Sequence, residues 1–196
     1  MQLILVRHGL PENAHSRDMS DPPLSDTGHF QAAQTCDRIA QESIDAIYSS
    51  ALRRAIESGE PLARKLGLTI TQIAEIGEVD NGEDSYISPE AIRAAGDWEA
   101  FLRDPIGYYG HDEAEFRERV LGGFEAIMQD AAGNRVAIFT HGFPINILLS
   151  RALGLDGLAN FVLRNGSITR LMGEDLNKLQ VLSVNETSHF IRDAVR

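Results

Sequence analysis

The sequence has little cysteine and no long apolar run. Cys36 is the single cysteine among 196 residues, so it cannot form a disulfide within the chain, and it has no CxxC partner. We therefore expect a reducing compartment, the cytoplasm. The N-terminal MQLILVRHG reaches a charge after a short apolar stretch, so we expect neither a signal peptide nor a membrane span there.

Positive charge is also scarce. The chain has 18 Lys and Arg against 29 Asp and Glu, a net charge of −11. This balance argues against binding nucleic acid or an anionic membrane, because both need a positive surface. An anionic substrate must then be held by local cations. No GxxxxGK[ST] loop, strand-linked GxGxxG, HxH or HExxH spacing is present, so we expect neither a nucleotide cofactor nor a metal site.

Apolar segments of strand and helix type alternate along the chain, with no linker or repeat between them. Strands are expected at 2–6, 43–49, 68–73 and 135–140, and a hairpin near 167–172 and 179–184. Helices are expected at 25–40, 50–66, 88–105, 113–131 and 144–154. This order predicts one α/β domain over 1–196, a three-layer sandwich whose central sheet is mostly parallel, with a helical insertion at about 83–112.

Particular residues predict where helices begin and end. Ser25 is expected to cap the first helix, and Ser49 or Ser50 the second. Pro61 should kink or restart that second helix, which Gly67 then ends.

Two histidines followed by glycine come directly after predicted strands. His8 follows the strand 2–6, and His141 follows 135–140. Arg53 and Arg54 lie within one helical turn of the strand that ends near Ser49. Ligands of parallel sheets bind beyond the carboxyl ends of the strands, so we expect these groups to share one pocket.

Several motifs resemble those of the histidine phosphatase superfamily, also called phosphoglycerate-mutase-like. They are LILVRHG (3–9), LSDTGHFQA (24–32), SALRRA (50–55), THG (140–142) and a looser match, IGEVDNG (76–82). The resemblance implies a phosphoglycerate-mutase-like fold and places the family arginine on Arg54, with Arg53 as the next choice. The family often follows RHG with Glu-Thr and an Asn, whereas here Asn13 comes one position early.

The implied reaction gives each residue a role. A neutral imidazole of His8 attacks phosphorus while a carbonyl holds its other nitrogen, and Gly9 leaves room for that approach. Arg7, Arg54 and His141 supply cations for the phosphoryl oxygens. These three residues, with Gly142 and Asn13, are the expected substrate contacts.

Glu78 is the expected proton donor to the leaving group and then the base that activates water. It is chosen from an acidic segment, 75–84, whose other acids, Asp80 included, are interpreted as mostly solvated surface.

The predicted activity is that of a metal-independent phosphoric monoester hydrolase of the histidine acid phosphatase type, acting on a small phosphorylated metabolite. A phosphoglycerate-mutase-type phosphotransferase and a non-catalytic phosphate-binding protein are the alternatives, and a homodimer is left open.

Overall fold

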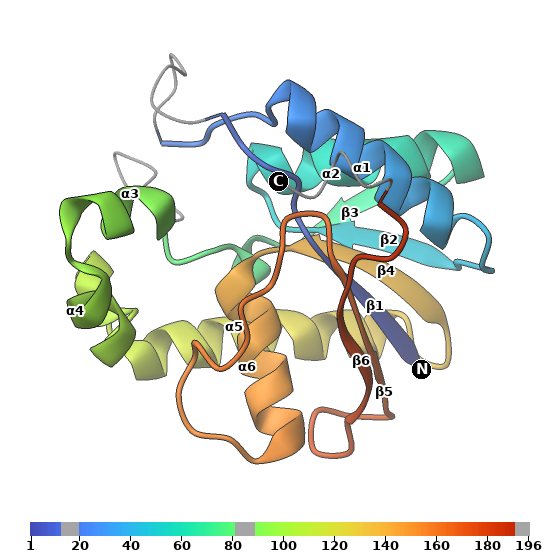
Figure 1. Cartoon of the computed structure of the whole chain (residues 1–196). Coiled ribbons are helices and arrows are strands. Elements are labelled where there is room, and N and C mark those ends of the chain that lie inside the picture. Colours follow the sequence, from blue (N-terminus) through green and yellow to red (C-terminus); the bar gives the residue numbers. More distant parts are fainter. Residues whose placement is uncertain (13–19, 81–88, 191–196) are drawn as a thin grey trace.

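A computed structural model describes residues 1–12, 20–80 and 89–190 (Figure 1). Its sheet has the strand order β3-β2-β4-β1-β5-β6. The strands are β1 (Gln2–Arg7), β2 (Ala46–Ser49), β3 (Ile70–Gln72), β4 (Arg135–Thr140), β5 (Ile168–Met172) and β6 (Gln180–Glu186). The first four strands run parallel to one another, and β5 and β6 are antiparallel, so the predicted mostly parallel sheet and the C-terminal hairpin are both confirmed.

Helices cover both faces of this sheet. They are α1 (Asp26–Ile39), α2 (Arg53–Leu66), α3 (Pro89–Ala95), α4 (Trp98–Arg103), α5 (Glu113–Asp130) and α6 (Gly142–Leu153), with short turns η1 (Ala74–Ile76) and η2 (Gly107–Tyr109). Figure 1 shows α1 and α2 on one face and α5 and α6 on the other, while α3 and α4 stand at one side. None of the described helices combines the length and hydropathy needed to cross a bilayer.

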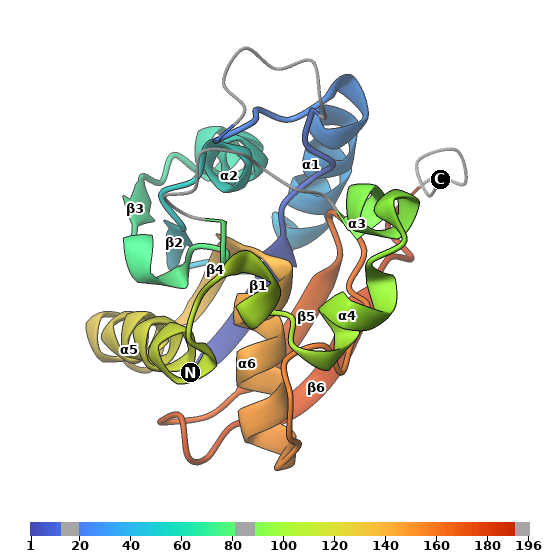
Figure 2. The same ribbon diagram turned by 90° about the vertical axis from the view of Figure 1, so that its left-hand side faces the viewer.

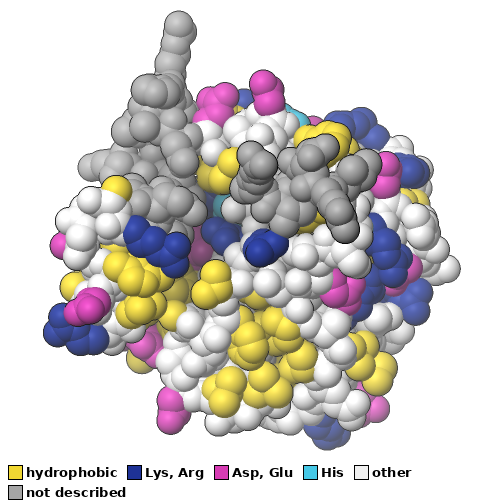
Figure 3. Space-filling model, viewed as in Figure 1, with side chains coloured by type: hydrophobic (Ala, Val, Ile, Leu, Met, Phe, Trp, Pro, Cys, Tyr) yellow, Lys and Arg dark blue, Asp and Glu magenta, His cyan; other side chains and the backbone are white. Residues whose placement is uncertain are grey.

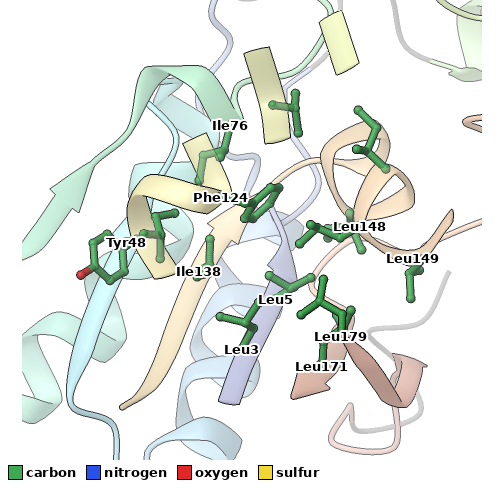
Figure 4. Close-up of a cluster of buried hydrophobic side chains, with 14 of the residues drawn as sticks. Leu3, Leu5, Tyr48, Ile76, Phe124, Ile138, Leu148, Leu149, Leu171 and Leu179 are labelled. Atoms are coloured by element: carbon green, nitrogen blue, oxygen red, sulfur yellow. The ribbon is translucent and has the colours of Figure 1, made fainter. Parts of the chain in front are cut away.

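Strand β1 shows why the sheet needs two helical layers. Its side chains alternate between the faces. Leu3 and Leu5 join the buried cluster beneath α5 and α6, part of which Figure 4 shows. Ile4 and Val6 join the cluster formed with α1 and α2. A continuous apolar strand therefore contributes to both cores, which confirms the predicted three-layer arrangement.

Most helix ends lie where the sequence predicts them. The Ser25 hydroxyl accepts a hydrogen bond from the Gly28 N–H at 3.1 Å and caps α1. Gly67 and Gly154 end α2 and α6 in the left-handed conformation, with φ of 67° and 64°.

The single helix expected over 88–105 is wrong, because the described residues form two helices, α3 and α4. Gly96 has a φ of 83°, which ends α3, and the Asp97 N–H bonds back to the Ile92 carbonyl at 3.2 Å. With η2, these helices make up the described part of the predicted insertion at 83–112, and residues 83–88 lie outside the described residues.

The expected start of α2 is also wrong. Its N-cap is Leu52, and no side chain caps it. Nor does α2 restart at Pro61, which lies inside a helix that runs from Arg53 to Leu66. The helix packs closely on the sheet at Gly59, where an added Cβ would lie 2.9 Å from Phe139.

Candidate active site

Three adjacent parallel strands carry their functional residues to the same edge of the sheet. The His8 N–H, just after β1, donates to the Thr140 carbonyl of β4 at 2.9 Å, and the Ser50 N–H, just after β2, donates to Phe139 at 3.0 Å. The rings of His8 and His141 consequently lie 5.0 Å apart between centroids. The sequence prediction that these two strand ends share one site holds in the structure.

The loop after β1 is held by α1 and α2. Gly9 N–H donates to the Ser58 hydroxyl and Leu10 N–H to the Gln31 side-chain oxygen, both at 2.9 Å. A Cβ on Gly9 would lie 2.5 Å from the Gly28 carbonyl oxygen of α1, closer than carbon and oxygen can approach. Glycine is therefore required here by the close packing of the loop against α1.

The His8 imidazole is held in one tautomer. Its Nδ1 lies 2.7 Å from the carbonyl oxygen of Gly9. A carbonyl only accepts, so Nδ1 carries the proton and Nε2 keeps its lone pair. Burial, and then the positive charges of Arg54 and Arg7, lower the pKa of His8 well below its usual value. Both effects favour the neutral ring at pH 7, the form whose Nε2 is able to act as a nucleophile.

His141 is oriented by a serine that sequence reasoning assigned to a helix cap. Its Nε2 lies 2.7 Å from the Ser50 hydroxyl, whereas its buried Nδ1 has no hydrogen-bond partner among the described residues. Burial and the charge of Arg54 lower the pKa of His141 well below its usual value. Both effects favour the neutral ring in this structure, and the expected role of His141 beside the phosphoryl oxygens stays a prediction.

Arg54, rather than Arg53, faces the site. The Arg54 side chain is fully buried, and its Nη2 donates to both oxygens of Asp80 at 2.7 and 2.9 Å. Arg53 instead points to the surface, where its Nε donates to Glu57 at 2.7 Å. Asp80 is 3% exposed, so its interpretation as solvated surface is wrong: the pairing with Arg54 draws it inside.

Glu78 lies at the N-terminus of α6. One of its carboxylate oxygens accepts from the Phe143 N–H at 3.2 Å, and the other from the Val79 N–H at 3.1 Å. Burial, followed by the negative charge of Asp80, raises the pKa of Glu78 to about 7. A carboxyl group with this pKa holds its proton about half the time at neutral pH.

The segment that carries Glu78 is fixed from two sides. The Arg119 guanidinium of α5 donates to the carbonyls of Glu75 at 2.8 Å, Gly77 at 3.2 Å and Glu78 at 3.3 Å. Thr140, at the end of β4, donates its hydroxyl hydrogen to the Ile76 carbonyl at 2.6 Å. Nothing in the sequence singles out Arg119, whereas Ser50 begins the SALRRA motif and Asp80 lies within IGEVDNG.

Five of the predicted residues line one cavity: Arg7, His8, Arg54, Glu78 and Gly142. We call this part of the cavity, together with the His141 ring, the phosphate end. Arg7 donates through Nη1 to the Leu163 carbonyl, and its buried Nε has no hydrogen-bond partner among the residues described. The remaining predicted contact, Asn13, lies outside the described residues.

No group of three His, Cys, Asp or Glu side chains that could hold a metal ion occurs within residues 1–12, 20–80 and 89–190. In the described part of the chain, the charged side chains at and beside the phosphate end are two guanidiniums, Arg7 and Arg54, and two carboxylates, Glu78 and Asp80.

The chain is similar to known proteins over most of its length. The profile of the histidine phosphatase superfamily (branch 1) matches residues 3–187. Proteins named probable phosphoglycerate mutase GpmB, from Salmonella choleraesuis and Klebsiella pneumoniae, are 32% identical over 182 residues, covering 87% of this chain and 84% of theirs.

Solved structures share the fold at lower identity. Phosphoserine phosphatase from Entamoeba histolytica superposes with a TM-score of 0.76 at 22% identity, covering 97% of this chain and 99% of that one. A mycobacterial glucosyl-3-phosphoglycerate phosphatase gives 0.75 at 22% identity, covering 95% and 99%.

Proposed function

Because the chain belongs to the histidine phosphatase superfamily, we propose that it is a phosphomonoesterase that hydrolyses a small phosphorylated metabolite through a phosphohistidine. One observation carries the proposal: the Gly9 carbonyl keeps the proton of His8 on Nδ1, so that Nε2 has a lone pair, and His8 lines the same cavity as Arg7, Arg54 and Glu78. A nucleophile, fixed positive charge and a proton donor are the groups that transfer of a phosphoryl group needs.

In the first step, His8 Nε2 attacks phosphorus, and the bond from phosphorus to the ester oxygen breaks. Glu78 gives its proton to that oxygen, so the alcohol leaves neutral. Arg7 and Arg54 hold the equatorial oxygens, on which negative charge accumulates in the transition state. His141 donates to the same oxygens through its Nδ1, which Ser50 leaves available by bonding Nε2.

In the second step, the Glu78 carboxylate takes a proton from water. The resulting hydroxide attacks phosphorus, the P–N bond breaks, and inorganic phosphate leaves with His8 neutral again. A pKa of about 7 suits Glu78 to both steps, because each protonation state is well populated at neutral pH.

We propose that this reaction needs no metal ion, because the arginines supply the positive charge. The test is phosphate release from a panel of phosphorylated metabolites, with and without a chelator and with His8→Ala. We expect release that the chelator leaves unchanged and that His8→Ala abolishes. Loss of activity in the chelator would overturn metal independence, and full activity of His8→Ala would overturn the mechanism.

A mutase is the second candidate, favoured by the names of the 32% identical relatives. It would return the phosphoryl group from His8 to another hydroxyl rather than to water. The same assay with 3-phosphoglycerate separates the two activities: a hydrolase releases phosphate in proportion to the ester consumed, and a mutase yields the isomeric ester.

A further inference from the structure

Beyond the phosphate end, the cavity is walled by apolar side chains from three separate segments. We call them the apolar wall: Trp98, Phe101, Leu102, Phe143, Phe161 and Val162. Trp98 stacks on Phe101 at 5.2 Å between centroids, and Phe101 lies 6.1 Å from Phe143 of α6. Trp98, Phe101 and Phe143 thus form a row of rings from α4 to α6, whose first turn contacts Glu78.

Part of this wall is open to solvent. Leu102 is 48% exposed and Val162 is 78% exposed, although both are large apolar side chains. In Figure 2, which brings this side of the molecule toward the viewer, α3 and α4 stand to the right of β1 and β4. Figure 3 shows apolar side chains gathered on the same side of the molecule, beside a hollow that contains charged side chains. Exposed apolar area at the mouth of a cavity favours a ligand that covers it.

Two polar side chains that line the cavity near the wall, Asn146 and Arg93, already have partners. The Asn146 amide donates to the Gly142 and Phe161 carbonyls, both at 3.0 Å, and its oxygen accepts from the Phe161 N–H at 2.9 Å. Arg93, the one lining cation away from the phosphate end among the described residues, lies over the Trp98 ring at 3.9 Å. This stacking extends the wall and engages the cation.

We infer that the leaving-group side of the site takes a hydrocarbon alcohol, so that preferred substrates are phosphate monoesters of uncharged alkyl or aryl alcohols. Esters whose alcohol carries a carboxylate are disfavoured, because that group would have to lie against the apolar wall and near Glu78 and Asp80. This inference rests on the proposed phosphatase activity.

A series of n-alkyl phosphates, from methyl to hexyl, tests the inference. Their alcohols are nearly equal as leaving groups, so differences in kcat/KM report burial of the chain. We expect each added methylene to raise kcat/KM by about two- to fourfold. Hexyl phosphate should exceed 3-phosphoglycerate and O-phosphoserine at least about tenfold. A flat series, or 3-phosphoglycerate above hexyl phosphate, would overturn the inference.

Substitutions in the apolar wall test whether it causes the preference for longer alkyl chains. Leu102→Ser and Val162→Ser should each lower the hexyl-to-methyl ratio of kcat/KM about threefold. Leu182→Ser is the matched control, because Leu182 has the same 48% exposure but lies on β6, outside the cavity. An unchanged ratio in both wall variants would overturn the inference. So would a preference for 3-phosphoglycerate that Arg93→Gln removes, since Arg93 would then hold the carboxylate.

Binding of alkylphosphonates separates this inference from the proposed function, because their P–C bond is not hydrolysed. Calorimetry should show hexylphosphonate binding at least about tenfold more tightly than methylphosphonate. Phosphate release from some esters with equal binding of the two phosphonates would overturn the inference alone. Release from none of the esters would overturn the proposed function and the substrate preference that rests on it.

Discussion

The phosphate end and the apolar wall are built on opposite principles. At the phosphate end, buried polar side chains are held by hydrogen bonds from several elements, as Arg54 is by Asp80. The apolar wall has few directional contacts, and Val162 projects 78% of its surface into solvent. Fixed charges suit a phosphoryl group, whose geometry is the same in every monoester. A less specific wall suits the alcohol, which differs from one substrate to another.

The largest loss of activity should come from substituting Arg54 at the phosphate end. Arg54→Lys keeps a positive charge but loses the planar guanidinium, whose Nη2 bonds Asp80 and whose fixed array of N–H donors matches phosphoryl oxygens better than one ammonium does. We expect kcat/KM to fall about 10²- to 10³-fold for every ester, whatever its alcohol. Arg53→Lys is the matched control: the Arg53 side chain is exposed, so this variant should retain activity within about twofold. Equal losses in the two variants would remove the distinction between these arginines.

The second-largest effect should depend on which alcohol leaves the phosphate ester. Glu78→Gln should slow alkyl phosphates about 10²-fold, because their alkoxides need a proton, and aryl phosphates only a few-fold. In the wild-type protein, Glu78 is protonated below its pKa of about 7, so kcat/KM for alkyl esters should fall as the pH rises through 7. The variant should lose this dependence.

The exposed Glu75 provides the control for that substitution. Glu75→Gln makes the same chemical change in the same acidic segment, and we expect both the rate and the pH profile to remain as in the wild-type protein. Equal slowing of alkyl and aryl esters by Glu78→Gln would exclude Glu78 as the proton donor.

A smaller effect is expected from Ser50, which contacts His141 but does not line the cavity. Ser50→Ala should lower kcat about tenfold and change the tautomer of His141, which nitrogen NMR of the imidazole detects. Ser49→Ala is the matched control, because it removes an adjacent buried hydroxyl that has no hydrogen-bond partner among the described residues. An unaltered His141 spectrum in Ser50→Ala would show that this serine does not position the ring.

The smallest effect concerns the whole molecule. A net charge of −11 should repel a dianionic ester before it reaches the arginines. Added salt screens this repulsion, so we expect association-limited kcat/KM to rise by less than about twofold between low and physiological ionic strength. A falling rate would instead indicate that the local cations dominate the encounter.

The two ends also differ in how far the sequence predicts them. His8 and His141 could be placed because each follows an apolar strand of a parallel sheet, and the sheet itself dictates that such ends meet. Asp80 could not be placed in the site from the sequence, because its burial depends on its pairing with Arg54, 26 positions away. The apolar wall could not be predicted either. It depends on how Gly96 turns α3 into α4 and how Asn146 holds the loop at Phe161.

The central claim is that His8 Nε2 receives the phosphoryl group. Rapid quenching of the protein during turnover of an ester labelled with ³²P, followed by peptide mapping, tests it directly. We predict an acid-labile, base-stable label on the peptide that contains His8, and none in His8→Ala. A label on His141 or on any other residue, or equal labelling of His8→Ala, would contradict the claim.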